Sequence, residues 1–375
     1  MVNKIIKVGI TGQSGFIGTH LFNYFGLQND IERIEFKDEF FQDKDVLDKF
    51  ISQCDVIIHL AAVNRHNDPQ VIYNTNIDLV KKLIESLNRN NSVAHVIFSS
   101  STQEDRDNFY GQSKKEGRKL LIDWTKKSGG IFTGLVIPNV FGPFGNPYYN
   151  SVVATFSHQL THNEKPKIDL DGKLKLIYVG ELINEIYRVI VDTKVYPELK
   201  LKYTSEIKVS ELLEKLNSYK DQYLNNGAIP ELNTTFEKNL FNTYRSYIDY
   251  KSFFPFSLKQ HADDRGTFVE IIRTLSSGQV SSSTTKPGLS RGNHFHTRKI
   301  ERFAVIKGKA LISIRRIGTN NILDFKLDGD KPAFVDMPIW YTHNITNIGS
   351  DDLYTQFWTN EFYDSSKSDT YFEKV

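Results

Sequence analysis

Two residues in the N-terminal half of the chain have the chemistry to exchange a proton with a substrate. Tyr110 and Lys114 are four positions apart and share one face if their segment is helical. An ammonium group beside a phenol favours the phenolate and lowers a pKa that is ordinarily about 10. Such a tyrosine can exchange a proton with a hydroxyl or carbonyl oxygen, and a serine at a strand end, here Ser101, can hold the same oxygen. Because this spacing also occurs on solvated helix faces, its context decides.

A second group of residues has the composition of a metal site. His294 and His296 are two positions apart and therefore point the same way if they lie on a strand. Glu301 follows on the next expected strand, and His343 comes from a distant one. Three imidazoles and one carboxylate suit a borderline divalent cation such as zinc. Three of the ten histidines fall at these positions, which argues against chance placement.

The start of the chain supplies the context for the tyrosine and lysine. An apolar run through residues 7–11 predicts a buried parallel strand, and three glycines spaced three apart follow it as a helical pattern begins. In a turn that binds a dinucleotide, the first glycine permits the tight turn and the second lets the backbone approach the pyrophosphate. The third lets helix and sheet pack closely, and the helix N-terminus binds the phosphates. The expected cofactor contacts here are Gly12, Gly15, Phe16, Ile17 and Gly18.

Further strands follow in the order typical of a doubly wound parallel sheet. Apolar runs at residues 31–36, 54–62 and 93–98 alternate with helical patterns. The run 54–62 ends in small residues, as needed where a cofactor lies across strand ends. Leu60, Ala61 and Ala62 therefore join the expected cofactor contacts. His59 could be catalytic, but a structural histidine is the commoner finding on an apolar strand.

The residues after the second expected strand bear on the type of cofactor. An acidic residue there binds the ribose 2′-hydroxyl of NAD, whereas a cation accepts the 2′-phosphate of NADP. Lys37 and Asp38 are adjacent at this position. The residues alone therefore leave the choice between the two cofactors open.

The chain changes character near residue 247. Residues 152–219 have a helical, amphipathic pattern, and residues 225–250 are aromatic and polar. Beyond them, short alternating segments separated by glycine and proline predict an antiparallel β sandwich or barrel. We therefore expect two domains, residues 1–247 and 248–375. The expected strands of the second include 266–272, 303–306, 310–314 and 353–358.

The composition is that of a soluble protein with no nucleic-acid or membrane partner. A chain of 375 residues fits two domains better than one. A net charge of +2 gives no support to a basic nucleic-acid-binding face, and the single cysteine excludes an internal disulfide. The apolar runs are too short to span a bilayer, and no signal-peptide pattern precedes the first strand. We therefore expect a cytoplasmic location.

With these motifs in order, roughly the first 245 residues resemble the extended short-chain dehydrogenase/reductases that act on nucleotide sugars, which have a Rossmann-type fold. The resemblance implies that Ser101, Tyr110 and Lys114 are catalytic and that Lys114 also contacts the cofactor. Residues 137–143 resemble a sugar-nucleotide contact segment of that family, which implies that Asn139 contacts substrate. The interval between Ser101 and Tyr110 is shorter than is usual in the family. We therefore expect a remodelled substrate side of the cleft.

The C-terminal part resembles the cupin (jelly-roll barrel) family. Residues 288–308 match the first cupin motif, while the second motif has Trp340 where the family usually has glycine. Residues 264–268 resemble a segment of cupin epimerases that act on deoxy-hexulose nucleotides, which implies a substrate contact by Arg265. The metal ligands implied by the two motifs are His294, His296, Glu301 and His343.

Together the two halves resemble bifunctional enzymes of capsular polysaccharide synthesis. The resemblance covers nearly the whole chain and includes residues 146–156, where Asn150 is an implied substrate contact. It implies C-3 epimerisation of a UDP-2-acetamido-2,6-dideoxy-4-hexulose in the cupin half. NADPH-dependent reduction of the C-4 ketone follows in the other half and gives the L-talose derivative on the path to UDP-N-acetyl-L-fucosamine. The resemblance favours Lys37 as the contact of the NADPH 2′-phosphate, and it implies zinc and a homodimer.

Three functions fit these motifs. The first is the bifunctional epimerase and reductase. The second is a single-activity NAD-dependent sugar-nucleotide 4-epimerase or dehydratase with a non-catalytic cupin module, and the third is a non-enzymatic sensor of NADP(H). A sensor needs no proton donor, and a single-activity enzyme needs no metal set. Consumption of stoichiometric NADPH separates the first two, because a 4-epimerase returns its hydride.

Overall fold

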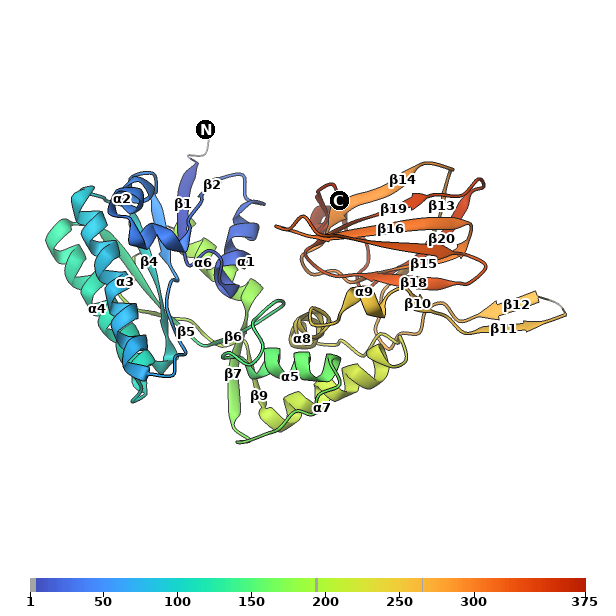
Figure 1. Ribbon diagram of the computed structural model, residues 1–375, viewed down its shortest axis with the longest axis horizontal. Coiled ribbons are helices and arrows are strands. Elements are labelled where there is room, and N and C mark those ends of the chain that lie inside the picture. The colour runs from blue at the N-terminus through green and yellow to red at the C-terminus, as the bar shows by residue number, and fades with distance from the viewer. Residues whose placement is uncertain (1–4, 193–194, 265) are drawn as a thin grey trace. The chain divides into compact units, whose positions relative to one another are not determined.

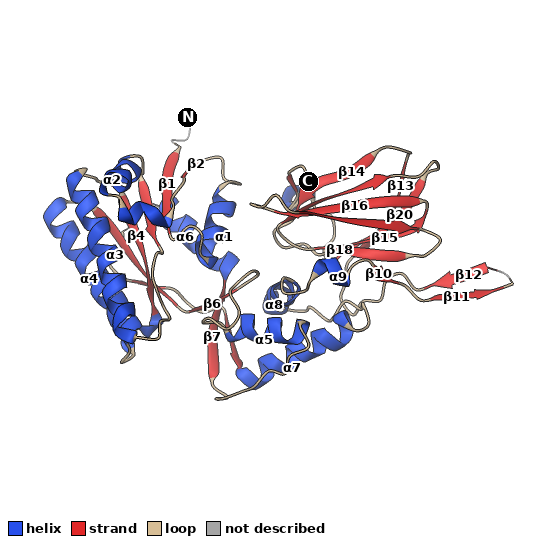
Figure 2. Cartoon of the chain, viewed as in Figure 1, coloured by secondary structure: helices blue, strands red, loops and turns tan. Residues whose placement is uncertain are grey.

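The computed structural model of the chain describes residues 5–192, 195–264 and 266–375. These residues form two compact units (Figure 1). The first contains Met1–Thr155 and Asp171–Val209, and the second contains Phe156–Leu170 and Ser210–Val375. The division falls within helix α5 (Val152–Thr161). Helices and parallel strands build the first unit, while antiparallel strands predominate in the second (Figure 2).

A six-stranded sheet forms the centre of the first unit. Its strand order is β2-β1-β3-β4-β5-β8, and every neighbouring pair is parallel. Since β2 and β3 lie on opposite sides of β1, the sheet has a switch point there, where the carboxyl ends of the strands open a crevice. The strands are β1 (Ile6–Thr11), β2 (Ile31–Ile34), β3 (Val56–His59), β4 (His95–Ser101), β5 (Ile131–Ile137) and β8 (Leu199–Lys200).

Helices cover both faces of this sheet (Figure 1). On one face, α1 (Phe16–Phe25) and α6 (Val179–Val191) pack on side chains of β1 such as Val8 and Ile10. The opposite face is covered by α2 (Lys44–Ser52), α3 (Pro69–Arg89) and α4 (Phe109–Ser128). A sheet buried on both faces requires apolar residues at consecutive strand positions, which explains the runs that predicted these strands.

The expected helical character of residues 152–219 is wrong in part. Helices α5, α6 and α7 (Val209–Tyr219) lie there, but so do β7 (Lys173–Tyr178), β8 and β9 (Ser205–Lys208). Strand β7 pairs in parallel with β6 (Asn139–Phe141) and antiparallel with β9. The alternation Lys-Leu-Lys-Leu at the start of β7 has the two-residue period of a strand, and this period identifies it.

Two five-stranded antiparallel sheets form most of the second unit, in the orders β10-β18-β15-β20-β13 and β17-β16-β19-β14-β21. The predicted fold class, a doubly wound α/β sheet followed by an antiparallel β domain of cupin-like type, is confirmed. The strands are β10 (Phe256–Ser257), β13 (Gln279–Thr285), β14 (Ser290–Phe295), β15 (Glu301–Lys307), β16 (Lys309–Arg316), β17 (Ile322–Asp328), β18 (Ala333–Met337), β19 (Tyr341–Asn347), β20 (Leu353–Thr359) and β21 (Tyr371–Phe372). A separate hairpin joins β11 (Gln260–Asp263) and β12 (Gly266–Val269).

Helices also contribute to the second unit. Helix α8 (Thr235–Arg245) reaches the sheets through Asn242, which donates to the Arg298 carbonyl, and through Arg245, which donates to the Met337 carbonyl. The short helix α9 (Tyr250–Phe253) follows. Residues 210–247 are therefore in contact with the β sheets. The predicted boundary at residue 247 divides the chain by enzymatic activity and not by compactness. It therefore stays a prediction.

A buried ion pair fastens the helical segment of this unit to its sheet. The guanidinium of Arg302 on β15 binds the carboxylate of Asp336 on β18 through two hydrogen bonds of 2.7 and 3.0 Å. Arg302 also donates to the Gly227 carbonyl at 2.8 Å, and the Tyr223 hydroxyl donates to Asp336 at 2.7 Å. The side chains of the pair are 1% and 0% exposed. Neither charge can regain water if its partner is lost.

Asp336→Asn is therefore expected to destabilise the second unit. Removing one partner of a buried, hydrogen-bonded pair costs about 3–5 kcal/mol of unfolding free energy, because the other charge remains buried. Urea unfolding followed by tryptophan fluorescence in a Trp124→Phe background measures this unit alone, since Trp340 and Trp358 both belong to it.

The matched control is Glu270→Gln, which neutralises a carboxylate in the same unit. Glu270 and Arg273 form an ion pair whose side chains are 50% and 64% exposed, so its loss is expected to leave the midpoint unchanged. Equal midpoints for the two variants would show that a buried, unpaired Arg302 costs the unit no stability.

Candidate functional site

In the turn between β1 and α1, the backbones of Gly12, Gly15 and Gly18 lie in direct contact. Gly12 has a φ of +72°, and its carbonyl oxygen accepts a hydrogen bond from the Gly15 N–H at 3.1 Å. A Cβ atom at Gly18 would lie 2.2 Å from that same oxygen. Within the described ranges, no side chain caps α1, whose N-cap residue is Gly15. The first N–H groups of the helix are thus available to an anion.

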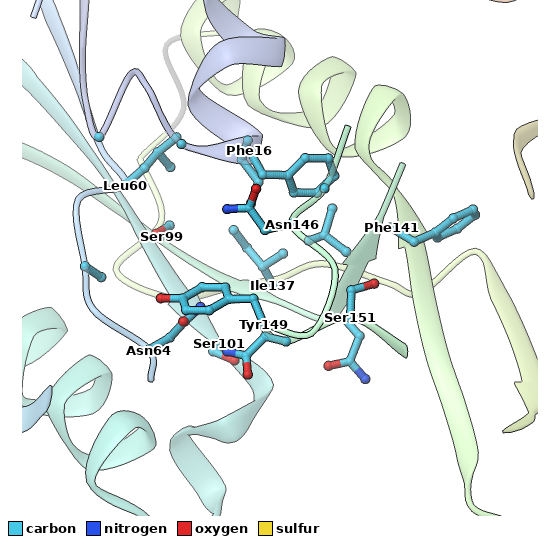
Figure 3. A pocket seen from close by; sticks show the side chains of 18 of the residues that line it. Phe16, Leu60, Asn64, Ser99, Ser101, Ile137, Phe141, Asn146, Tyr149 and Ser151 are labelled. Carbon is cyan, nitrogen blue, oxygen red and sulfur yellow. The ribbon is translucent and has the colours of Figure 1, made fainter. Parts of the chain in front are cut away.

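A cavity of about 420 Å³ lies at the carboxyl ends of strands of the six-stranded sheet (Figure 3). It brings together most of the predicted cofactor contacts with the predicted catalytic residues. Ala61 is absent from its lining, although its backbone packs directly on Gly12. The predicted residues that line the cavity are Gly12, Gly15, Phe16, Ile17, Gly18, Leu60, Ala62, Ser101, Tyr110, Lys114, Asn139 and Asn150.

A further predicted cofactor contact lies outside the cavity lining. Lys37 is exposed at the N-cap of a 3₁₀ turn, Asp38–Gln42, and it does not line the cavity. Its neighbour Asp38 accepts a hydrogen bond from the Ser14 hydroxyl at 3.1 Å. Arg265 lies outside the described residues, so its predicted substrate contact stays a prediction.

Ser101, Tyr110 and Lys114 come from the end of β4 and the first turns of α4. A short 3₁₀ turn, Thr102–Asp105, fills the brief interval between them. This turn packs against α4 so closely that a Cβ at Gly111 would lie 2.0 Å from the Gln103 carbonyl oxygen. This short connection thus sets the distance between the serine strand and the tyrosine helix.

The pKa of Tyr110 departs from the expected direction. Burial, with a smaller effect of Tyr149, raises it to about 12. The ammonium of Lys114 lies 5.7 Å from the centroid of the Tyr110 ring and 5.0 Å from that of Phe98. Burial lowers the pKa of Lys114 to about 8, against the opposing effect of Glu104. The expected lowering of the Tyr110 pKa is therefore wrong here, because desolvation outweighs the nearby ammonium. The neutral phenol is the form that can donate a proton.

A buried carboxylate supports this arrangement. Glu104, in the 3₁₀ turn, binds the Arg118 guanidinium of α4 at 2.7 and 3.0 Å and accepts a hydrogen bond from the Ser100 hydroxyl. Arg118 pairs in addition with Glu198 at 2.9 Å. The network links β4, the turn and α4.

His59 has the surroundings of a structural residue. It is fully buried, its Nδ1 lies 2.7 Å from the Thr11 hydroxyl, and its ring stacks on Phe98. Burial, together with the Lys114 charge, lowers its pKa to about 3. The imidazole is thus held neutral and does not line the cavity.

Sequence reasoning missed several cavity residues, of which Tyr149 is the largest. Its ring points into the cavity, on the side where Asn64 and Ser101 lie (Figure 3). Arg65 donates to the carbonyl oxygens of Tyr148 and Tyr149, which fixes the loop between β6 and α5 where it lines the cavity. The Asn-Pro-Tyr-Tyr-Asn segment signalled this loop, but only the fold brings it to Arg65.

In the second unit, the four predicted metal ligands converge. Their ligand atoms lie within 4.8 Å of one another. His294 on β14 pairs with His343 on β19, His296 follows β14 directly, and Glu301 begins β15. The cluster thus joins both sheets of this unit.

Trp340 has an unusual backbone conformation next to the ligands. Its φ is +62°, a conformation that favours glycine and that a bulky residue adopts only at a cost. Its N–H donates to the His296 carbonyl at 2.7 Å, and its ring stacks on Phe295. Trp340 thus has a backbone conformation typical of glycine, and its side chain packs beside the ligand segment.

The four residues fit a divalent cation. Nε2 of His296 and Nε2 of His343 lie 3.1 and 3.3 Å from Oε2 of Glu301. In the described part of the chain, none of these three buried atoms has a hydrogen-bond partner in suitable geometry. Burial and the neighbouring imidazoles lower the pKa of His294 to about 4. Burial alone would raise the pKa of Glu301, but His296 and His343 outweigh it and hold that pKa below its ordinary value. The pKa of His296, by contrast, is raised, because the Glu301 carboxylate outweighs the effect of burial. A bound cation would take the place of that proton, since imidazoles bind metals in the neutral form and carboxylates in the ionised form.

Among the described residues, no helix is both long and apolar enough to cross a membrane.

Comparisons with known proteins match both units. Residues 8–198 match the NAD dependent epimerase/dehydratase family, and residues 261–371 match the polysaccharide biosynthesis C-terminal domain. UDP-2-acetamido-2,6-beta-L-arabino-hexul-4-ose reductase of Pseudomonas aeruginosa is 33% identical over 369 residues, which are 98% of each chain.

Solved structures agree. The capsular polysaccharide assembling protein CapF from Staphylococcus aureus is 33% identical, with a TM-score of 0.64 over 99% of this chain and 100% of that one. RMD from Pseudomonas aeruginosa, solved with NADPH, is 18% identical, with a TM-score of 0.52 over 58% of this chain and 82% of that one. The latter likeness shows the fold alone.

Gly18→Ala is expected to weaken the binding of a reduced nicotinamide dinucleotide by about tenfold or more. The added methyl group would meet the backbone of Gly12 and Gln13, which cannot move aside as a side chain can. Fluorescence titration of the dinucleotide measures the loss. Gly172→Ala is the control, since nothing lies within 4 Å of a Cβ there. Equal affinities in both variants would contradict the role given to this turn.

Proposed function

The chain belongs to the NAD dependent epimerase/dehydratase family, and we propose that it is a bifunctional nucleotide-sugar enzyme. The second unit epimerises a UDP-2-acetamido-2,6-dideoxy-4-hexulose at C-3. The first unit then reduces the C-4 ketone with NADPH. The product is UDP-2-acetamido-2,6-dideoxy-L-talose, on the path to UDP-N-acetyl-L-fucosamine for a capsule or O-antigen. The enzyme acts as a cytoplasmic homodimer.

The presence of two different sites in one chain carries this proposal. The first site has a proton donor beside a dinucleotide turn, and the second has three imidazoles and a carboxylate. The chain is similar along its whole length to a UDP-sugar reductase and to CapF. The alternative of a single-activity 4-epimerase or dehydratase leaves the His/Glu cluster without a task, and a sensor of NADP(H) leaves Tyr110 without one.

Ketone reduction uses residues of the first unit. NADPH supplies the hydride. The N–H groups at the start of α1 bind the pyrophosphate, and Ser101 holds the substrate oxygen. Tyr110 gives its phenolic proton to that oxygen as negative charge develops there, and the Lys114 ammonium stabilises the phenolate left behind. Asn139 and Asn150 contact the sugar nucleotide.

Epimerisation uses residues of the second unit. The proton on C-3, next to the ketone, can leave only if the charge that develops on the C-4 oxygen is stabilised. A divalent cation, which we propose to be zinc, supplies a Lewis acid for this purpose when bound. The residues that would hold it are His294, His296, Glu301 and His343, and Arg265 contacts the substrate.

NADPH is proposed over NADH, with Lys37 as the contact of the 2′-phosphate. The support is the cation that follows β2, where this fold binds the ribose side of a dinucleotide. Titration with both dinucleotides tests this choice, and tighter binding of NADH would contradict it.

The two activities should be separable by mutation. Tyr110→Phe removes the phenolic proton while the ring still packs, so ketone reduction is expected to fall by roughly 10²–10⁴-fold. In D2O this variant should still exchange the C-3 proton of the 4-keto sugar for deuterium. His296→Ala should lose that exchange and keep reduction of the epimerised ketone, which the Tyr110→Phe variant can supply. Mass spectrometry of the sugar and NADPH absorbance measure the two steps.

Two outcomes would contradict the assignment of one reaction to each unit. Undiminished C-3 exchange in His296→Ala would remove epimerisation from the second unit. If the wild-type protein converts substrate to product with no net NADPH consumption, the single-activity alternative holds.

Ketone reduction should also fall as the pH rises through about 8, where Lys114 loses its proton. Its buried ammonium faces the Glu104 carboxylate, the phenol of Tyr110 and the neutral His59. The folded protein releases this proton at lower pH than the unfolded chain, so stability rises with pH between about 8 and 10.5. The loss of activity is therefore not unfolding.

Profiles of kcat/KM against pH for the wild type and Lys114→Arg measure this fall in rate, which is the alkaline limb of the profile. The guanidinium stays charged throughout the range, so the variant should show no fall near pH 8, whatever its absolute rate. An identical alkaline limb in both proteins would assign that limb to another group.

A further inference from the structure

Asp369 lies behind the imidazole of His296. Its backbone carbonyl oxygen is the hydrogen-bond partner of Nδ1 of that ring. Since a carbonyl only accepts, Nδ1 carries a proton, and in the neutral ring that a metal requires the lone pair therefore lies on Nε2. Nε2 is the atom that faces Glu301 at 3.1 Å. This contact thus selects the tautomer and the ring orientation that a metal ligand needs.

The carboxylate of Asp369 fixes that carbonyl in place. Oδ1 accepts from the N–H of Thr297 at 3.1 Å and from its hydroxyl at 2.6 Å. Oδ2 accepts from the N–H groups of Arg298 and Lys299, both at 3.0 Å. The Asp369 side chain is 0% exposed. An ionised carboxylate, which only accepts, matches these four donors in the turn directly after His296.

The surrounding segment has attachments of its own. The Glu373 N–H donates to the Asn293 carbonyl at 3.0 Å, and the Glu373 carboxylate pairs with Arg315 at 2.9 Å. The Tyr371 ring stacks on Phe295 at a centroid distance of 5.3 Å. Loss of the Asp369 carboxylate therefore frees the carbonyl behind His296 without detaching the segment.

We infer that Asp369 is a positioning residue of the candidate metal site, which presents Nε2 of His296 to the cation through its own backbone carbonyl. This inference rests on the proposed metal site. It goes beyond the four ligands, because Asp369 touches neither the cation nor the substrate. Partners that orient a ligand in this way typically change metal affinity by 10–100-fold.

The test is the affinity of Asp369→Asn for Zn²⁺. Asparagine keeps the size of the side chain but places an NH₂ group against the N–H groups of Arg298 and Lys299. Competition with a chromophoric chelator measures the affinity, and a fall of about 10–100-fold is expected. Reduction of the epimerised ketone in the first unit should be unchanged, since Asp369 belongs to the other unit.

Asp364→Asn is the matched control. Asp364 also caps a turn in the C-terminal segment, where its carboxylate accepts from the Ser366 N–H at 2.8 Å and from its hydroxyl at 2.7 Å. It has no contact with a ligand, so the same substitution should leave zinc affinity unchanged. Wild-type affinity in Asp369→Asn would overturn the positioning role.

Two further variants keep the result unambiguous. If His296→Ala binds zinc as the wild type does, the proposed metal site itself fails, whereas loss in His296→Ala with none in Asp369→Asn overturns only the positioning role. If Asp369→Asn does not fold, Thr297→Val replaces it. That change removes only the hydroxyl bond to Asp369, and it should weaken zinc binding while the thermal melt of the protein stays cooperative. Unchanged affinity in this variant would overturn the inference equally.

Discussion

Direct contact between backbone segments is the constraint on which the N-terminal site depends. Gly18 lets α1 approach the turn after β1, and Gly111 lets the 3₁₀ turn after β4 lie against α4. Both contacts leave less space than one methyl group needs. They place a helix N-terminus and a helix side chain at the same edge of the sheet, so a dinucleotide and a proton donor share one cavity. The parallel sheet supplies the edge, and the glycines bring the helices close enough to use it.

Pairs of buried charges are a second structural constraint, and they occur in both units. Three of the buried ionisable groups have a charged or ionisable counterpart on a different element: Lys114 has Glu104, Arg302 has Asp336, and Glu301 has its histidines. Such pairs add little net stability, because desolvation costs about as much as the attraction returns. Their effect is to fix which elements lie together. The pairs at the two candidate sites also shift pKa values, and those shifts set which protonation states the reactions start from.

The sequence predicts most of what local spacing can encode. The glycine turn, the serine at the end of β4, the Tyr110–Lys114 pair and the His/Glu ligands all lie within short motifs, and the structure brings each group together. Burial is not local, so the direction of the Tyr110 pKa was wrong. Contacts between distant segments were missed for the same reason: Arg65 reaches Tyr149, and Asp369 reaches His296, only after the chain has folded. The strand β7 was missed although its two-residue period is visible.

The place of β21 in the sheet has a consequence for the nascent chain. This strand and Asp369 follow all four candidate ligands in sequence. Even so, β21 pairs with the backbone at His294, and the Asp369 carbonyl binds the ring of His296. Until residues 369–373 have left the ribosome and joined the sheet, the ligands lack their final orientation. The dinucleotide turn is made from the first residues of the chain and does not use this C-terminal segment. Completion of the candidate metal site is therefore a late event in folding, and the glycine turn can complete its fold before it.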